Sequence, residues 1–244
     1  MIYILVPSYN DSQNFQSLFK DIADTLKNIR YKIIIVDDGS LDKTVQVIKK
    51  LSKKYPLTRI GYRENKGPGY AFQVGFGYLI PKLKQTDIVV TMEADNSCDL
   101  SILKKMLSEC NKYDIILSSP FAKGGKFLGI DKKRKVLGEA ANFIDKIVFR
   151  IKGINTYSSF YRAYRADILK KAQKSYKSSL IIENGFSAVV ELLIKLSKLN
   201  ATFFEIPATL DWRKRKGKSK MKVGKTTVRH LVIYKNYFQK KYSL

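Results

Sequence analysis

The first half of the chain alternates short apolar runs with longer amphipathic stretches. Four runs are rich in Ile, Val and Leu and end in polar residues, "YILVPS", "KIIIVDD", "DIVVTME" and "DIILSS". The segments that follow the first two, "NFQSLFKDIADTLKN" and "LDKTVQVIKKLSKKY", carry apolar residues at helical spacing. Continuous apolar strands joined by helices are typical of a parallel sheet that is buried on both faces. The pattern therefore predicts an α/β fold.

Polar side chains gather where the predicted strands end, in "PSYND", "VDDGS", "ENKGPG" and "EADNS". Sheets of this kind bind ligands at the carboxyl ends of their strands. Because polar residues without a binding role would be scattered along the chain, this clustering favours a binding site at that edge of the sheet.

Two acids, Glu93 and Asp95, stand at the tip of one buried strand. They are either solvent-facing or ligands of a metal ion. The helix that follows can be capped by Ser97 or Asp99, so capping does not require either acid. Carboxylate oxygens are the ligands that hard divalent cations prefer, and the metal site is the favoured interpretation.

The composition points to a polyanionic partner. The 244 residues carry a formal net charge of +25, and 45% of them are hydrophobic, enough for a sizeable core. A surplus of this size favours nucleic acid, an anionic membrane surface or a phosphorylated substrate. Cys98, Cys110 and the single histidine, His230, show no zinc-ligand spacing. Both cysteines are expected to be free thiols.

No apolar run reaches the roughly 18 residues of a membrane span. The opening "MIYILV" is too short for the core of a signal peptide and is followed at once by Pro7. We therefore expect a cytoplasmic protein that is soluble or peripheral to the membrane.

Seven motifs occur in a characteristic order: "VPSYND", "IIIVDDGS", "NKGPGYAFQVGF", "MEAD", "SFYRAYRADIL", "GFSAVVELL" and "GKSK". In this order the chain resembles family 2 glycosyltransferases, most closely the polyprenyl-phosphate sugar synthases of the dolichol-phosphate mannosyltransferase type. The resemblance implies the GT-A fold, a Rossmann-like and mostly parallel sheet with helices on both faces. It also implies a single domain and an inverting transfer from a nucleoside-diphosphate sugar such as GDP-mannose or UDP-glucose.

The resemblance assigns the metal site. Glu93, Ala94 and Asp95 match the family's Asp-Ala-Asp motif, and its next polar ligand falls at Ser97. Mg²⁺ or Mn²⁺ held there would neutralise the diphosphate leaving group. Glu93 departs from the family's Asp, which makes Asp95 the firmer ligand.

The nucleoside end is also implied by the resemblance. Pro7, Tyr9 and Asp11 match the family's motif after the first strand, and Val36 and Asp38 match positions that contact the base. Asp37 is expected to be structural. The "NKGPG" turn lacks the full spacing of a dinucleotide fingerprint.

The implied acceptor is a polyprenyl phosphate, whose oxygen is already ionised and needs no general base. Arg134 matches an arginine beside the reacting groups, and Lys214 and Lys220 match basic positions that contact the diphosphate and the acceptor. Pro120 and Phe160 replace the family's Arg and Gly. Glu191 is either a base on the acceptor side or a salt-bridge partner.

The C-terminal part raises a membrane hypothesis. We expect a glycosyltransferase domain over residues 1–225 and an amphipathic helix over residues 226–244. This helix and the basic segment before it, residues 213–225, are expected to dock on an anionic membrane, with or without a separate membrane subunit. The alternative is that this helix packs on the core of the domain.

Two other functions remain as alternatives. A saccharide, teichoic acid or protein hydroxyl is the alternative acceptor. A nucleic-acid-binding protein is a remote alternative, because acids at the strand ends would repel nucleic acid.

Overall fold

The computed structural model describes residues 1–217 and 219–243, so Lys218 of the basic segment and Leu244 lie outside the described residues. The described residues form nine strands: β1 (Ile2–Ser8), β2 (Tyr31–Asp38), β3 (Leu57–Tyr62), β4 (Ile88–Thr91), β5 (Ile115–Ser119), β6 (Lys126–Leu128), β7 (Arg162–Arg165), β8 (Phe203–Pro207) and β9 (Thr209–Asp211). The helices of the described part are α1 (Phe15–Thr25), α2 (Thr44–Leu51), α3 (Pro68–Leu79), α4 (Leu103–Glu109), α5 (Lys132–Phe149), α6 (Ala166–Tyr176), α7 (Ala188–Lys198) and α8 (Val223–Phe238).

Seven strands form one sheet in the order β3-β2-β1-β4-β7-β5-β8. Every neighbouring pair is parallel except those of β7, which runs antiparallel between β4 and β5. The predicted mostly parallel α/β sheet is therefore confirmed. Because β1, β2, β4 and β5 point the same way, their carboxyl ends meet at one edge.

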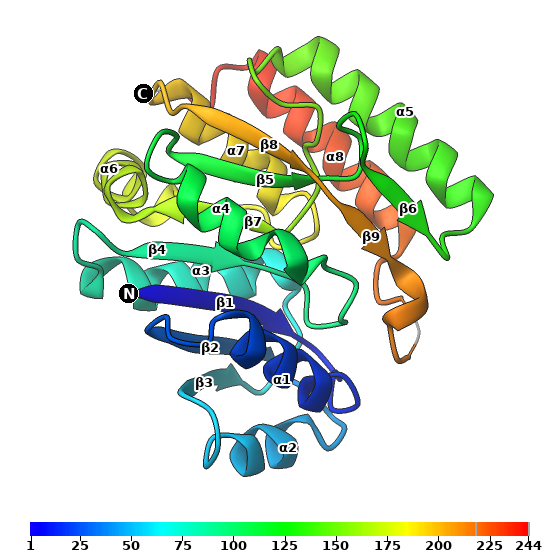
Figure 1. Ribbon diagram of the computed structural model, residues 1–244. Helices are drawn as coiled ribbons and strands as arrows, with labels where there is room; N and C mark the ends of the chain where they lie inside the picture. The colour runs from blue at the N-terminus through cyan, green and yellow to red at the C-terminus, as the bar shows by residue number, and fades with distance from the viewer. Residues whose placement is uncertain (218, 244) are drawn as a thin grey trace.

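Helices cover both faces of this sheet (Figure 1). Alternate residues of β2 enter two separate cores, Ile33 and Ile35 on one side and Ile34 and Val36 on the other. The first core contains the apolar faces of α1, α2 and α4, and the second contains those of α3, α6 and α7. This double burial explains why the strands read as continuous apolar runs.

The second half contains elements that were not assigned from the sequence, among them strand β7 and helix α6. Helix α5 begins at Lys132, in a run of basic residues. This start has a local cause, because the carboxylate of Asp131 accepts hydrogen bonds from the backbone N–H groups of Lys133 and Arg134. Asp131 is thus the N-cap of α5.

Helix α8 starts at Val223, three residues before the expected boundary, and lies beside α5 (Figure 1). Ile233 and Tyr242 are buried in the second core, and the ring of Phe149 on α5 contacts the rings of Tyr234 and Tyr237. The inner face of α8 therefore packs on the domain. Among the residues that the structure describes, no helix combines the length and apolar character of a membrane span.

Candidate active site

A cavity of about 800 Å³ lies at the carboxyl edge of the sheet and extends between α5 and α8. The strand ends contribute Pro7, Ser8, Asp38 and Ser118, and the loops after β1 and β4 contribute the acids. The predicted site residues that line it are Pro7, Tyr9, Asp11, Asp38, Glu93, Ala94, Asp95, Ser97, Arg134 and Lys220. The clustering expected from the sequence is therefore present in space.

Two residues of the expected set lie elsewhere. Val36 is fully buried in the second core and does not line the cavity. Lys214 is exposed in the short turn Trp212–Lys214 and does not line the cavity, whereas its neighbour Arg215 does. The sequence match is thus offset by one residue from the basic side chain that faces the site.

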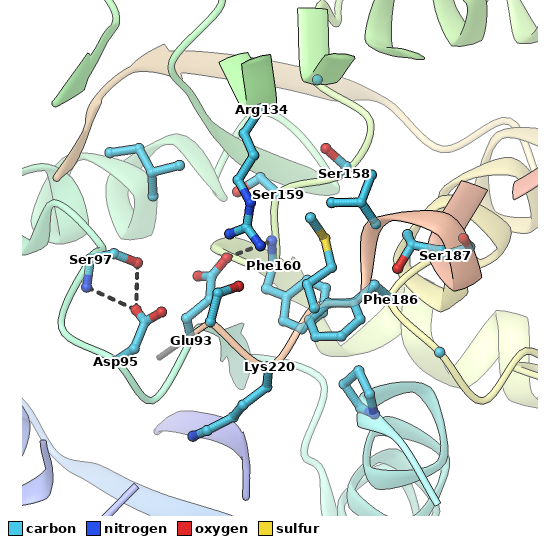
Figure 2. A pocket seen from close by; sticks show the side chains of 18 of the residues that line it. Glu93, Asp95, Ser97, Arg134, Ser158, Ser159, Phe160, Phe186, Ser187 and Lys220 are labelled. Carbon is cyan, nitrogen blue, oxygen red and sulfur yellow. Dashed lines mark hydrogen bonds between the residues drawn. The ribbon is translucent and has the colours of Figure 1, made fainter. Parts of the chain in front are cut away.

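Asp95 is held by its own loop. Its Oδ1 atom accepts hydrogen bonds from the backbone N–H of Ser97 at 3.0 Å and from the Ser97 hydroxyl at 2.5 Å (Figure 2). Its Oδ2 atom accepts from Nε of Arg215 at 2.6 Å and from a second guanidinium nitrogen. Ser97 therefore orients the carboxylate while Arg215 balances its charge.

The carboxylate of Glu93 bridges two segments. Its Oε1 atom accepts the backbone N–H of Phe160 at 3.3 Å, and its Oε2 atom accepts the Cys98 thiol at 2.9 Å. Figure 2 shows Glu93 between Asp95 and Phe160. Burial, and then the charge of Asp95, raise the pKa of Glu93. Burial and the nearby Glu93 carboxylate likewise raise the pKa of the Cys98 thiol, which stays protonated as a donor.

Asp11 and Asp38 anchor the loops around the proposed nucleoside end. Asp11 pairs with Lys220 and accepts the N–H of Tyr9 at 3.1 Å; burial raises its pKa, and Lys220 opposes this effect. Asp38 accepts the N–H groups of Lys66 and Gly67 at 2.7 and 2.8 Å, and burial raises its pKa. Gly67 has a φ of +100°, a backbone conformation that favours glycine, so its role in the "NKGPG" turn is conformational. The turn is not a dinucleotide fingerprint.

Basic side chains enter the cavity from two directions. Arg134 extends from α5 toward Glu93, and Lys220 extends from the C-terminal loop toward the start of the chain (Figure 2). The guanidinium carbons of Arg134 and Arg215 lie 5.6 and 4.7 Å from the centre of the Trp212 ring. Arg134 is half-buried although the adjacent lysines of α5 are exposed, which distinguishes it from a solvated charge run.

Glu191 is a salt-bridge partner. Its Oε1 atom lies 2.5 Å from Nζ of Lys195, and its Oε2 atom accepts the N–H groups of Ile182 and Glu183. Both side chains are 1% exposed and neither lines the cavity. Of the two interpretations of Glu191, the structure supports the structural one.

A histidine–aspartate pair inside the cavity was not predicted from the sequence. His230, far along the chain, lies with Nε2 at 2.6 Å from Oδ1 of the buried Asp145, which also accepts the Tyr234 hydroxyl at 2.8 Å. All three residues line the cavity. A signal existed in the sequence, because Asp145 is the one acid among the apolar residues of the last turns of α5. Only the fold, however, pairs it with a residue 85 positions away on another helix.

The donor set suits a hard cation that shares its shell with a substrate. Within residues 1–217 and 219–243 no three His, Cys, Asp or Glu side chains converge on one point. Asp95, Glu93 and the Ser97 hydroxyl supply oxygen only, and each Glu93 oxygen accepts one hydrogen bond and so keeps a further lone pair. Mg²⁺ and Mn²⁺ bind in this way, with phosphate oxygens and water as the remaining ligands. These residues fit such an ion.

A family model described as "Glycosyl transferase family 2" matches residues 3–172, well over half of the chain. The chain belongs to glycosyl transferase family 2. The resemblance seen in the seven sequence motifs is thereby confirmed.

Within this family, the dolichol-phosphate mannosyltransferase of Pyrococcus furiosus is 31% identical over 94% of the chain, which spans 61% of that protein. The undecaprenyl-phosphate mannosyltransferase of Micrococcus luteus is 25% identical over 91% of the chain and 88% of its own length. The polyprenol monophosphomannose synthase of Mycolicibacterium smegmatis is 26% identical over 89% of the chain and 80% of its own length.

Solved structures establish the fold. The glucosyl-3-phosphoglycerate synthase of Mycobacterium tuberculosis, in complex with Mn²⁺ and UDP, superposes with a TM-score of 0.64 at 14% identity over 97% of this chain and 79% of its own. TarS of S. aureus superposes with a TM-score of 0.59 at 18% identity over 86% of this chain and 60% of its own. The family 2 chain thus has the GT-A fold that the motifs implied.

Proposed function

We propose that the protein is a metal-dependent, inverting hexosyltransferase that moves a sugar from a nucleoside-diphosphate donor to a polyprenyl phosphate at a membrane surface. The observation that carries this proposal is the meeting of Asp95 and Glu93 with Arg134 and Lys220 in one cavity. Acids suit a metal-bound diphosphate, and cations suit a second phosphate. The names of the three polyprenyl-phosphate relatives support this acceptor.

The donor would lie along the carboxyl edge of the sheet. Tyr9 offers an aromatic face to the base or ribose, and Asp11 and Asp38 offer carboxylate oxygens to hydroxyl groups. Asp95, with Glu93 and the Ser97 hydroxyl, would hold Mg²⁺ or Mn²⁺ against the diphosphate. A bound divalent ion neutralises the negative charge that grows on the leaving group. GDP-mannose and UDP-glucose are the donors to test first.

The acceptor phosphate needs positioning more than activation. A phosphate oxygen is ionised at neutral pH, so it can attack the anomeric carbon from the face opposite the diphosphate without losing a proton. Arg134 reaches into the cavity from α5 and offers a fork of donors that matches phosphate geometry. Lys220, which is paired with Asp11 in the donor-free protein, would add a second positive charge from the other side. These two residues would hold the acceptor in line.

The surface beside the cavity suits a membrane. Helices α5 and α8 expose large apolar side chains, of which Phe143 is 64% and Phe238 is 68% exposed. We call this the α5–α8 apolar surface; it comprises Val136, Leu137, Phe143, Ile144, Ile147, Val228, Leu231, Val232 and Phe238. Basic residues flank it, and residues 223–243 contain no acid. Apolar insertion and attraction to anionic lipids act together at such a surface. Because the surface adjoins the cavity, a lipid phosphate at the cytoplasmic face would be within reach.

A hydroxyl acceptor is the second candidate, and one observation favours it. The carboxylate of Asp145 orients the His230 imidazole inside the cavity, and an oriented imidazole is the usual base for a hydroxyl group. A saccharide, teichoic acid or protein hydroxyl would then replace the lipid phosphate. The net charge gives no comparable support to nucleic acid, because acids line the cavity.

The test is a matrix of donors and acceptors. Purified protein is incubated with GDP-mannose or UDP-glucose labelled in the sugar, with Mg²⁺ or Mn²⁺, and with either a polyprenyl phosphate or the corresponding free polyprenol. The proposal expects label to enter the organic phase with the phosphate and not with the alcohol. Label that appears on the alcohol, and that is lost in His230→Gln, would favour the second candidate instead.

A further inference from the structure

Arg215 occupies the carboxylate that is assigned to the metal. Its Nε atom lies 2.6 Å from Oδ2 of Asp95, and a second guanidinium nitrogen contacts the same oxygen. The Arg215 and Asp95 side chains are only 18% and 14% exposed. Because the other oxygen of Asp95 is hydrogen-bonded to Ser97, the carboxylate is fully engaged within the chain.

The segment that carries Arg215 is fastened to the same edge of the sheet at two more points. Lys220 forms an ion pair with Asp11. The backbone N–H of Lys216 donates to Oδ1 of Asn14 at 3.0 Å, and Nδ2 of Asn14 donates to the Lys216 carbonyl at 3.1 Å. Two cations of one segment therefore neutralise two acids of the donor site.

These contacts conflict with metal binding at one atom. A divalent cation at Oδ2 of Asp95 and the guanidinium of Arg215 would repel each other, so the ion must displace Arg215. A guanidinium binds phosphate oxygens with the same two-pronged geometry that it uses for a carboxylate. A nucleoside diphosphate brings both the ion and a new anionic partner to the place that Arg215 leaves.

We propose that Arg215 is a diphosphate-binding residue that Asp95 holds in the donor-free protein. When metal and nucleotide bind together, Arg215 moves from Asp95 to the diphosphate. The proposal rests on the proposed nucleoside-diphosphate donor. It assigns to Arg215 the contact that the family motif places at Lys214, whose side chain lies outside the cavity.

The exchange predicts effects of opposite sign. Without nucleotide, Arg215 competes with the metal and lowers its affinity. With nucleotide, Arg215 adds a charge-assisted contact and raises the affinity of the complex. A residue with a merely structural role would move both affinities the same way.

The experiment has two parts. Electron paramagnetic resonance first measures free Mn²⁺, and hence Mn²⁺ binding, without nucleotide. The binding of GDP or UDP is then measured at saturating Mn²⁺. The proteins are wild type, Arg215→Gln, Arg215→Lys and a matched control, Arg213→Gln. Arg213 forms the same kind of two-pronged pair, but with Asp211, and it does not line the cavity. Circular dichroism tests whether each variant is folded. If Arg215→Gln does not fold, Arg215→Lys, which keeps the charge, is compared with wild type instead.

Arg215→Gln should bind Mn²⁺ alone about tenfold more tightly and nucleotide about tenfold more weakly, in line with one hydrogen bond to a charged group. Arg215→Lys should lie between it and wild type, and Arg213→Gln should match wild type. Unchanged or weaker Mn²⁺ binding in Arg215→Gln would overturn the competition at Asp95. If neither GDP nor UDP binds any of the four proteins, the proposed function and the contact of Arg215 with a diphosphate are both contradicted. The affinity for Mn²⁺ alone would still show whether Arg215 competes with the metal at Asp95.

Discussion

Glu93 and Phe160, two residues at which the chain departs from the family pattern, touch each other: the Phe160 N–H donates to Oε1 of Glu93 at 3.3 Å. A shorter aspartate at position 93 would place its carboxylate farther from this amide. The Phe160 ring turns away and stacks on Phe186, with ring centres 5.7 Å apart. The longer acid thus ties the tip of β4 to the loop before β7, and the two departures form one local arrangement.

The partly buried carboxyl of Glu93 leads to a prediction about how stability depends on pH. Burial, and then Asp95, raise its pKa, so the folded state favours its protonated form. Stability from such a group is present below the unfolded pKa and is lost as pH rises through the folded pKa. Glu93→Gln mimics the protonated form, so in EDTA it should melt at a higher temperature than wild type at pH 7, with the difference shrinking toward pH 4. Calorimetry measures this, with Glu64→Gln, an exposed acid outside the cavity, as the control. A difference that does not depend on pH would count against the assignment.

Arg134 is predicted to act on transfer more than on donor binding, because its charge is assigned to the acceptor phosphate. Arg134→Ala should lower the transfer rate on the order of 10²-fold, as expected for the loss of a charged group at the reacting centre. Nucleotide affinity, measured by calorimetry, should change little. Lys133→Ala removes a neighbouring charge that does not line the cavity and should retain the wild-type rate. Equal rates for the two variants would mean that Arg134 is only a surface charge.

The α5–α8 apolar surface is predicted to bind anionic vesicles. Phe143→Glu and Phe238→Glu place a charge on exposed positions, so folding should survive while sedimentation with phosphatidylglycerol vesicles decreases several-fold. Leu41→Glu is the matched control, because Leu41 is 84% exposed in the loop before α2, on the part of the chain away from α5 and α8 (Figure 1). High salt should weaken wild-type binding. Equal binding by all three variants would exclude this surface as the docking face.

The Glu191–Lys195 pair is predicted to be structural. Lys195→Met leaves a buried carboxylate without its cation, which should lower the free energy of unfolding by about 3 kcal/mol. Glu191→Gln together with Lys195→Met removes both charges and should recover much of that loss. Urea denaturation followed by circular dichroism measures all three proteins. A Lys195→Met variant as stable as wild type would contradict the contribution of the pair.

The sequence predicted the features that depend on local pattern. Strands buried on both faces, such as Ile33–Val36 in β2, read as apolar runs, and acids at their ends mark the site. Strand β7 was missed because its four residues, with Arg162 fully buried at one end, carry no apolar run and take their position from β4 and β5. Pairs such as Arg215–Asp95 and His230–Asp145 join residues 120 and 85 positions apart, so only the fold brings them together.

The most direct test of the central claim is sugar transfer to a polyprenyl phosphate by wild type and Asp95→Ala, with and without Mn²⁺. Asp95 is partly exposed and its loop is held by other contacts, so the variant should fold, as circular dichroism would verify. We predict that labelled sugar enters the organic phase only with wild type, metal and the lipid phosphate together, and that Asp95→Ala lowers the rate at least about 10²-fold. Normal metal-supported transfer by Asp95→Ala, or no transfer to the lipid phosphate by wild type from either GDP-mannose or UDP-glucose, would contradict the claim.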